Sequence, residues 1–242
     1  MRTAAALIIG NELLSGKIAE CNLQGLAREL RALGVRLERA VMVLDDVAVI
    51  AREVAELSVK HDVVFTSGGV GPTHDDLTME SVARAFGVGV VVAPELEQMI
   101  RRYYGERCTE GHLLMARVPE GARLISTEAV PWPTVVMRNV WVLPGVPEVF
   151  RMKLPHVRGE LGVSAPFVSF AVYTTLDEGD IKELLDRVVA AHPEVEVGSY
   201  PKWHDPEYRT KLTFDGTDPA RVSAARDAFL VELPAETLVK TE

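Results

Sequence analysis

The stretch from His61 to Gly87, HDVVFTSGGVGPTHDDLTMESVARAFG, constrains the fold of this chain more than any other. It opens with Val63–Thr66, a short apolar run of β-branched and aromatic residues, which predicts a buried strand of a parallel sheet. A loop rich in glycine follows, and Leu77, Val82 and Phe86 then recur at helical spacing. A strand, a tight loop and a helix in this order are typical of an α/β protein.

The glycine loop, Ser67–Thr73, is the first candidate for a ligand site. Three glycines within four positions let the backbone turn tightly and lie close to a ligand, because no Cβ intervenes. The N-terminus of the following helix adds amide donors and a dipole that favours negative charge. The residues expected to bind phosphate, through backbone amides or hydroxyls, are Ser67, Gly68, Gly69, Gly71 and Thr73. A glycine loop alone is equally consistent with a plain tight turn, so the prediction depends on its neighbours.

Acidic residues follow the glycine loop directly. Asp75 and Asp76 could hold a cation that bridges to a phosphate, although two adjacent acids are often only a solvated helix cap. Asp76 or Thr78 suits the N-cap of the helix, and Thr78 is also a candidate phosphate contact. His74 could ligate a softer metal ion such as Co²⁺, but a histidine in such a loop more commonly faces solvent.

The chain before this stretch shows the same alternation. Thr3–Ile9 and Val35–Leu44 are apolar or alternating runs that predict strands. Helical spacing follows each of them, first from Asn22 onward and then over Val47–Lys60. The order β-α-β-α-β-α implies a mostly parallel sheet with right-handed crossovers.

Loops at the carboxyl ends of parallel strands meet at one edge of the sheet, which is where ligands of open α/β sheets bind. The three loops predicted to meet there are Gly10–Gly16, Asp45–Asp46 and Ser67–Asp76. The candidate ligand contacts in the first of them are Gly10, Asn11 and Glu12. Glu12 alone would more commonly be a surface acid, so the convergence of acids from separate loops is the stronger signal.

Two features precede a second loop rich in proline and glycine, which begins at Pro144. Pro131-Trp132-Pro133 predicts a rigid segment, because prolines fix the backbone. Thr134–Met137 and Val140–Leu143 then predict a β-hairpin around Arg138-Asn139. Pro144 and Gly145 follow as further ligand candidates, since Gly145 permits close approach of a ligand.

Composition shifts at Pro155–Pro166, where four glycine and proline residues predict a linker. A helix that begins at Val149 should therefore end near Leu154, and we place the first domain at residues 1–158. Residues 165–242 follow the order β-α-β-β-α-β, which predicts a small ferredoxin-like α+β domain.

Composition also narrows the class of protein. The chain has 242 residues and a formal net charge of −9 at pH 7, which argues against a nucleic-acid partner held by phosphate contacts. Its two cysteines, Cys21 and Cys108, make neither a metal framework nor a disulfide scaffold. No apolar run approaches the roughly 20 residues of a membrane span. The N-terminal apolar run is too short for a signal peptide, so we expect a cytoplasmic protein without a membrane partner.

Four strings in order, GNELLSGK, VLDDVAVI, TSGGVGPTHDDLT and NVWVLPGVPEVF, carry a resemblance to a known family. They resemble the molybdenum-cofactor-biosynthesis, or molybdopterin-binding-like, domain, in the branch found in competence-damage-inducible CinA proteins and eukaryotic-type FAD synthases. VEVGSYPKWH, at Val195 to His204, resembles the segment that follows this domain in the same proteins. The resemblance implies a three-layer α/β/α sandwich for the first domain, in agreement with the predicted order of strands and helices.

The chain departs from the family's usual pattern at four places. Asn11 stands where the family usually has aspartate or threonine, and Glu20-Cys21-Asn22 stands where it commonly has Asp-Thr-Asn. His112–Met115 and Val130–Pro133 differ from the usual CinA strings, and the second of these fits the FAD-synthase branch better. The resemblance extends neither to the deamidase domain of full-length CinA proteins nor to an adenylyltransferase domain.

The resemblance implies metal-dependent hydrolysis of a nucleotide diphosphate such as ADP-ribose or FAD, which predicts a pyrophosphatase. This chemistry needs a cation and donors around the attacked phosphate. The predicted catalytic residues are Asp76, Asp45 and Asp75, and the predicted metal ligands are Asp45, Asp76 and Glu12. Hard oxygen ligands suit Mg²⁺ or Mn²⁺, with Co²⁺ and K⁺ as further candidates. The alternative is a molybdopterin-binding module without hydrolase activity, and in either case the family implies a homo-oligomer.

Overall fold

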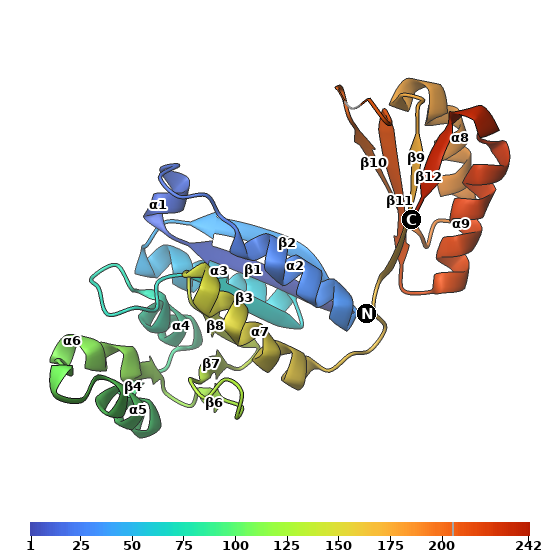
Figure 1. The fold of residues 1–242 in the computed structure, drawn as a ribbon. Helices are drawn as coiled ribbons and strands as arrows, with labels where there is room; N and C mark the ends of the chain where they lie inside the picture. The colour runs from blue at the N-terminus through green and yellow to red at the C-terminus, as the bar shows by residue number, and fades with distance from the viewer. Residues whose placement is uncertain (205) are drawn as a thin grey trace. The chain divides into compact units, whose positions relative to one another are not determined.

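The computed structural model describes residues 1–204 and 206–242. The chain divides into two compact units, Met1–Val163 and Ser164–Glu242, which we call the N-terminal and C-terminal units. Figure 1 shows helices covering a central sheet in the N-terminal unit and a separate sheet with two helices in the C-terminal unit.

A six-stranded sheet of order β2-β1-β3-β8-β7-β6 forms the centre of the N-terminal unit. Its strands are β1 (Arg2–Ile9), β2 (Val35–Val43), β3 (Val63–Ser67), β8 (Val140–Leu143), β7 (Thr134–Met137) and β6 (Arg123–Ile125). The pairs β2–β1, β1–β3 and β3–β8 are parallel, whereas β8–β7 and β7–β6 are antiparallel. The expected mostly parallel sheet is therefore confirmed, and the predicted hairpin supplies its antiparallel edge.

Alternation along β1 separates the two faces of this sheet. Ala5, Leu7 and Ile9 belong to one buried cluster, and Ala4, Ala6 and Ile8 belong to another, as expected for side chains that alternate across a strand. The first cluster includes residues of α3 (Val47–Lys60), α4 (Thr78–Phe86) and α5 (Pro94–Tyr104). The second includes residues of α2 (Asn22–Leu33) and α7 (Pro147–Leu161). Helices on both faces of one sheet give the expected three layers (Figure 1).

Short elements complete the N-terminal unit. A single turn, α1 (Asn11–Leu14), follows β1. The strands β4 (Val90–Val92) and β5 (Arg117–Pro119) form an antiparallel pair apart from the main sheet. Three short helical segments lie between α5 and β5, namely η1 (Gly105–Arg107), α6 (Glu110–Leu113) and η2 (Leu114–Ala116).

Helix α7 is longer than the sequence predicts. It begins at Pro147 and runs to Leu161, past the expected end near Leu154 and with Pro155 inside it. A proline within a helix removes one backbone hydrogen bond and disfavours continuation. Burial of the residues beyond Pro155 offsets this cost. His156 is buried against the segment that holds Val130 and Thr134, and Val157 is buried in the second cluster of the sheet. Tertiary burial thus overrides the local signal, and the predicted linker is shorter.

The C-terminal unit confirms the predicted order. It consists of β9 (Val168–Thr174), α8 (Glu178–Ala191), β10 (Glu196–Pro201), β11 (Thr210–Gly216), α9 (Pro219–Glu232), η3 (Ala235–Thr237) and β12 (Leu238–Thr241). Its sheet has the order β10-β11-β9-β12 with every pair antiparallel, which is the split-βαβ arrangement of ferredoxin-like domains. Asp177 and Asp218 cap the N-termini of the two helices by accepting backbone N–H bonds.

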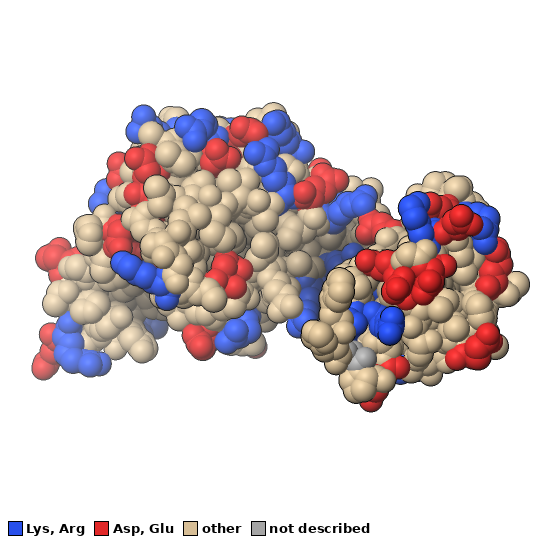
Figure 2. All heavy atoms as spheres, turned by 90° about the horizontal axis from the view of Figure 1, so that it is seen from above, with Lys and Arg blue, Asp and Glu red and all other residues tan. Residues whose placement is uncertain are grey.

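Charged side chains of both signs are interspersed on the face seen in Figure 2, rather than gathered into one basic field. Among the described residues, no helix combines the length and the apolar character that crossing a membrane requires. Both cysteines are free thiols, with Cys21 exposed and Cys108 half-buried.

Candidate functional site

A cavity of about 600 Å³ lies at the carboxyl edge of the parallel strands. The residues that end β1 and β3 and those that follow β2 and β8 line it, as the topology requires of parallel neighbours. The predicted site residues that line this cavity are Gly10, Glu12, Asp45, Ser67, Gly68, Gly69, Gly71, Thr73, Asp75, Asp76, Pro144 and Gly145. The structure thus brings together residues from all the predicted loops, while the role of each one stays a prediction.

The glycine loop is shaped by contacts within the protein. Gly68 has φ +113°, and a Cβ there would lie 2.2 Å from the carbonyl oxygen of Ile9. Gly69 has φ +64°, and a Cβ there would lie 2.5 Å from Oγ1 of Thr78. Any side chain at these positions would collide with protein atoms. The two glycines are therefore needed for the loop's own packing, whether or not a ligand lies against its amides.

Thr78 fastens the glycine loop instead of capping α4 or lining the cavity. Its side chain is fully buried, its Oγ1 donates to the carbonyl oxygen of Gly68 at 2.8 Å, and its N–H donates to the carbonyl of Gly69 at 3.0 Å. The N-cap position belongs to Leu77, which makes no side-chain cap bond. The expected N-cap role of Asp76 or Thr78 is therefore wrong, because Thr78 is drawn inward by the loop carbonyls.

Asp76 holds the glycine loop in a tight turn. One oxygen, Oδ2, accepts the backbone N–H of Thr73 at 2.7 Å and also the Thr73 hydroxyl proton. The Thr73 hydroxyl has one proton, and the hydrogen-bond distance assigns it to Asp76. The neighbouring Asp75 is half exposed, and one of its carboxylate oxygens lies 3.9 Å from Nδ1 of His74. His74 is almost fully exposed, in line with the solvent-facing alternative.

Asp45 joins the loop after β2 to the loop after β1. Its Oδ2 accepts the backbone N–H of Asn11 at 2.8 Å, and its own N–H donates to Oδ1 of Asn11 at 3.2 Å. Asn11 is thereby used in fixing Asp45 and is not among the residues that line the cavity. In both Asp45 and Asp76 the described hydrogen bonds use Oδ2, and the other carboxylate oxygen takes no part in them.

The charged side chains that line the cavity are all negative, among the described residues. Five carboxylate residues line it, namely Glu12, Glu20, Asp45, Asp75 and Asp76. Among the described residues that line it, none is lysine, arginine or histidine. No group of three or more His, Cys, Asp or Glu side chains is arranged to hold a metal ion anywhere in the described parts of the chain. The acids therefore surround the cavity without forming a complete metal centre of their own.

Asn22 was not predicted as a site residue, yet it lines the cavity and joins three elements there. Its Nδ2 donates to Oγ of Ser67 at 3.0 Å and to the carbonyl oxygen of Gly145 at 2.8 Å, while the side-chain oxygen is buried with no partner among the described atoms. The comparison of Glu20-Cys21-Asn22 with the family string Asp-Thr-Asn could have identified this residue. Asn22 is the one position of that string at which this chain and the family agree.

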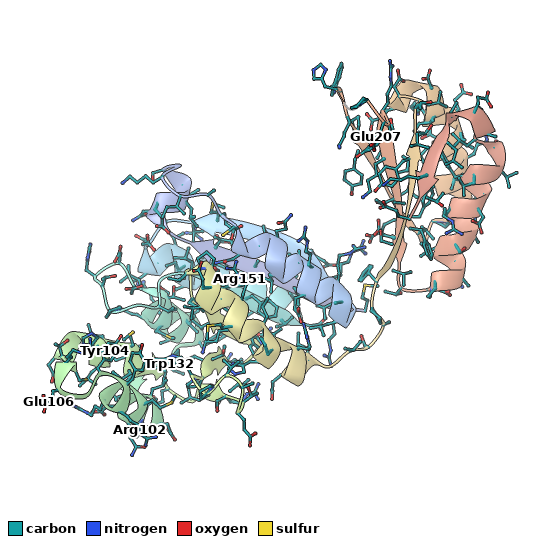
Figure 3. The ribbon with its side chains drawn as sticks, viewed as in Figure 1. Arg102, Tyr104, Glu106, Trp132, Arg151 and Glu207 are labelled. Atoms are coloured by element: carbon teal, nitrogen blue, oxygen red, sulfur yellow. The ribbon has the colours of Figure 1, made fainter. Side chains whose placement is uncertain are left out.

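Trp132 and Met115 line the cavity as well and were not predicted to do so. Trp132 belongs to the segment expected only to be rigid, and it is labelled in Figure 3. Met115 belongs to His112–Met115, one of the strings that depart from the family pattern. Both come from segments outside the predicted loops, and nothing in their local spacing marks them as neighbours of the glycine loop.

The chain matches two family descriptions, one after the other. Residues 5–157 match "Probable molybdopterin binding domain", and residues 166–242 match "FAD synthase, middle domain". A protein from Archaeoglobus fulgidus is 33% identical, over 91% of this chain and 93% of its own length. A probable FAD synthase from Caenorhabditis briggsae is 33% identical, over 94% of this chain and 49% of its own length. A CinA-like protein from Myxococcus xanthus is also 33% identical, over 93% of this chain and 57% of its own length.

This chain thus spans about half the length of the probable FAD synthase it matches. Among solved structures, the CinA protein from Thermoplasma acidophilum, described as having unknown function, is similar with a TM-score of 0.61. It is 28% identical and covers 66% of this chain and 98% of its own. These similarities confirm the resemblance drawn from the four sequence strings, and the solved structure supports the α/β fold of the larger unit.

Proposed function

Because this chain belongs to the probable molybdopterin binding domain family, we propose that its cavity hydrolyses a nucleotide diphosphate with the help of a divalent metal ion. The chain continues into an FAD synthase middle domain. The substrate class is a dinucleotide such as ADP-ribose or FAD. We include FAD as a candidate substrate because relatives are named probable FAD synthases. We include ADP-ribose because the chain resembles CinA-like proteins.

One observation carries this proposal: the cavity is lined by five carboxylate residues and, within the described residues, by no basic side chain. A diphosphate would be repelled by such a wall unless a cation lay between the phosphates and the acids. Amide donors from the glycine loop could bind a phosphate alone, but they do not explain why acids from three separate loops face the same space. A cation-dependent reaction at a phosphate explains both features.

The residues present fit a hard cation of the Mg²⁺ or Mn²⁺ type. Such ions are commonly bound by one or two carboxylates and complete their coordination with water and substrate phosphates, so no group of three protein ligands is needed. Asp45 and Asp76 would hold it, each through the carboxylate oxygen that its loop contacts leave unused. The bound ion would supply charge neutralisation at the attacked phosphorus.

The chain's own groups would do the remaining work. The loop amides around Gly68 and Gly69 would donate to non-bridging phosphate oxygens, where negative charge grows during attack. In the overall reaction a water molecule adds its oxygen to one phosphorus, and the bridging P–O bond breaks. The leaving phosphate takes up a proton, so that ADP-ribose gives AMP and ribose 5-phosphate, and FAD gives AMP and FMN.

Three single substitutions test the assignment of the acids. In Asp76→Asn and Asp45→Asn, an amide oxygen can still accept the loop N–H bonds, so the fold should persist while one negative charge is lost. We expect AMP formation, followed by chromatography, to fall by about 100-fold or more in each variant, because several kcal/mol of transition-state charge stabilisation depend on the ion.

The matched control is Asp46→Asn. Asp46 is adjacent in sequence but caps α3 by accepting the N–H of Val49 at 2.9 Å, and it does not line the cavity. Asparagine is an equally good N-cap, so this variant should keep wild-type activity. Equal activity in all three variants would remove Asp45 and Asp76 from the reaction.

A further inference from the structure

Trp132 is the one aromatic residue among the described residues that line the cavity. It is half-buried, and its apolar contacts belong to the same cluster as α3 and α4. The wall around it is otherwise polar or aliphatic, with Met115 from the η2 segment. An aromatic side chain in the wall of a cavity that is also lined by acids and by the glycine loop offers an apolar face in the same space as the groups proposed to hold phosphate.

The segment that carries Trp132 is held rigid by its own sequence. Pro131 has a fixed φ, and the residue before Pro133 is restricted to extended conformations, so the backbone on both sides of Trp132 has little freedom. Prolines also lack an N–H, and the carbonyl groups of this segment must find donors elsewhere.

Two buried side chains of α7 supply these donors. Lys153 is 4% exposed, and its Nζ donates to the carbonyl oxygens of Trp132 and, at 2.9 Å, of Pro133. One turn further along, His156 is 1% exposed, with Nε2 2.9 Å from the carbonyl oxygen of Val130 and Nδ1 2.8 Å from Oγ1 of Thr134. The contact with a carbonyl requires a proton on Nε2, so Nε2 donates.

Burying an ammonium group costs free energy, and burial lowers the pKa of Lys153 to about 8. Leucine or methionine would fill the same space under the sheet without this cost. The lysine therefore does something that packing alone does not: it fixes the positions of two consecutive carbonyl groups and, with them, the direction in which the Trp132 side chain leaves the backbone.

We propose that Trp132 is the stacking platform for the planar heterocycle of the ligand, and that Lys153 is a positioning residue that sets the orientation of this platform. The inference rests on the proposed function, because it assigns the heterocycle of a nucleotide, flavin or pterin to the apolar part of the same cavity. It adds that affinity for the ligand has a ring-dependent component, separate from the component due to phosphate.

The test is a set of binding measurements by calorimetry with Mg²⁺ present. The probes with a ring are AMP, FMN and 6-hydroxymethylpterin, and the probe without one is inorganic pyrophosphate. The variants are Trp132→Leu, which keeps an apolar side chain, and Trp132→Phe, which keeps an aromatic face. Base–aromatic stacking predicts that Trp132→Leu weakens binding of at least one ring probe by roughly 5- to 150-fold, that Trp132→Phe retains most of it, and that pyrophosphate is unaffected.

Lys153→Met tests the positioning role. It should weaken the same ring probe by roughly tenfold while pyrophosphate binding stays at the wild-type value, as expected when a stacking surface is displaced but not lost. A merely structural role for Lys153 would instead weaken both kinds of probe together. Trp203→Ala is the control for removal of a tryptophan, because Trp203 is 90% exposed and lies in the C-terminal unit. It should change none of the affinities.

The outcomes separate this inference from the proposed function. Ring-dependent binding that needs Trp132, without any AMP formation from dinucleotides, would support the platform and refute the hydrolase. Hydrolysis that persists unchanged in Trp132→Leu, with unchanged binding of every ring probe, would overturn the platform and leave the hydrolase standing. Equal losses for ring probes and pyrophosphate, or no binding of any ring probe by the wild type, would also overturn it.

Discussion

Lys153 gives the protein a stability that depends on pH in the direction opposite to that of a lysine whose pKa is raised by an ion pair. Its pKa is lowered from 10.5 to about 8 because burial disfavours the charged form. Between these two values the unfolded chain carries a proton at this position that the folded chain has released. The free energy of unfolding therefore rises with pH across this window and is lowest, as far as this group is concerned, below pH 8.

The magnitude follows from the shift. At ~1.4 kcal/mol per pKa unit, the displacement from 10.5 to about 8 corresponds to about 3 kcal/mol. Lys153→Met lacks this group, so the wild type should gain about 2.5 kcal/mol relative to the variant between pH 7 and pH 10, with the remainder gained above pH 10. Other groups that titrate in the same range are common to both proteins and cancel in the difference.

Urea unfolding followed by tryptophan fluorescence measures this difference. Trp203→Phe in both proteins removes the exposed tryptophan of the C-terminal unit and leaves Trp132 and Trp141 to report on the N-terminal unit. Lys17→Met is the control, because Lys17 is an exposed lysine and its removal should leave the stability difference flat across the pH range. A difference between wild type and Lys153→Met that stays constant from pH 7 to pH 10 would show that folding does not lower the pKa of Lys153.

Two further predictions concern the floor of the cavity. Gly69→Ala should destabilise the N-terminal unit by more than the ~1 kcal/mol expected from a left-handed φ alone, because the new Cβ would meet Oγ1 of Thr78 at 2.5 Å. Gly87→Ala is its matched control in urea unfolding, since Gly87 has φ +68° with open space around it, and equal losses in the two variants would contradict the clash. Asn22→Ala should cost ~0.5–1.5 kcal/mol for each hydrogen bond lost, the buried one to Oγ of Ser67 and the part-buried one to the carbonyl of Gly145, and an unchanged urea midpoint would argue against that network.

Elements whose signals are local could be predicted from the sequence. Helix α3 and strands β7 and β8 begin and end at the expected residues, because their caps, apolar periods and turns lie within a few residues of one another. The end of α7 could not be predicted in this way. Pro155 argues against a helix locally, and only the burial of His156 and Val157 against distant segments carries it on to Leu161.

The same division applies to the cavity. The acids and glycines follow strands directly, so the rule that parallel strands end at one edge was enough to bring them together. Asn22 and Lys153 donate hydrogen bonds to backbone carbonyls far away in the chain, those of Gly145 and Trp132, and such contacts leave no periodic trace in the sequence. Thr78 could not be placed from its neighbours in sequence alone. Threonine is a common N-cap residue, but the hydroxyl of Thr78 donates to the carbonyl of Gly68 instead.

The most direct test of the account is whether the wild-type protein forms AMP from a dinucleotide in a metal-dependent way. ADP-ribose and FAD are each incubated with the protein and Mg²⁺, Mn²⁺ or Co²⁺, and the products are separated by chromatography with and without a chelator. We predict AMP together with ribose 5-phosphate or FMN from at least one substrate, and none once the chelator is added. Absence of AMP with every metal, together with tight pterin binding that needs no metal, would refute the hydrolase and identify the cavity as a molybdopterin-binding site without hydrolase activity.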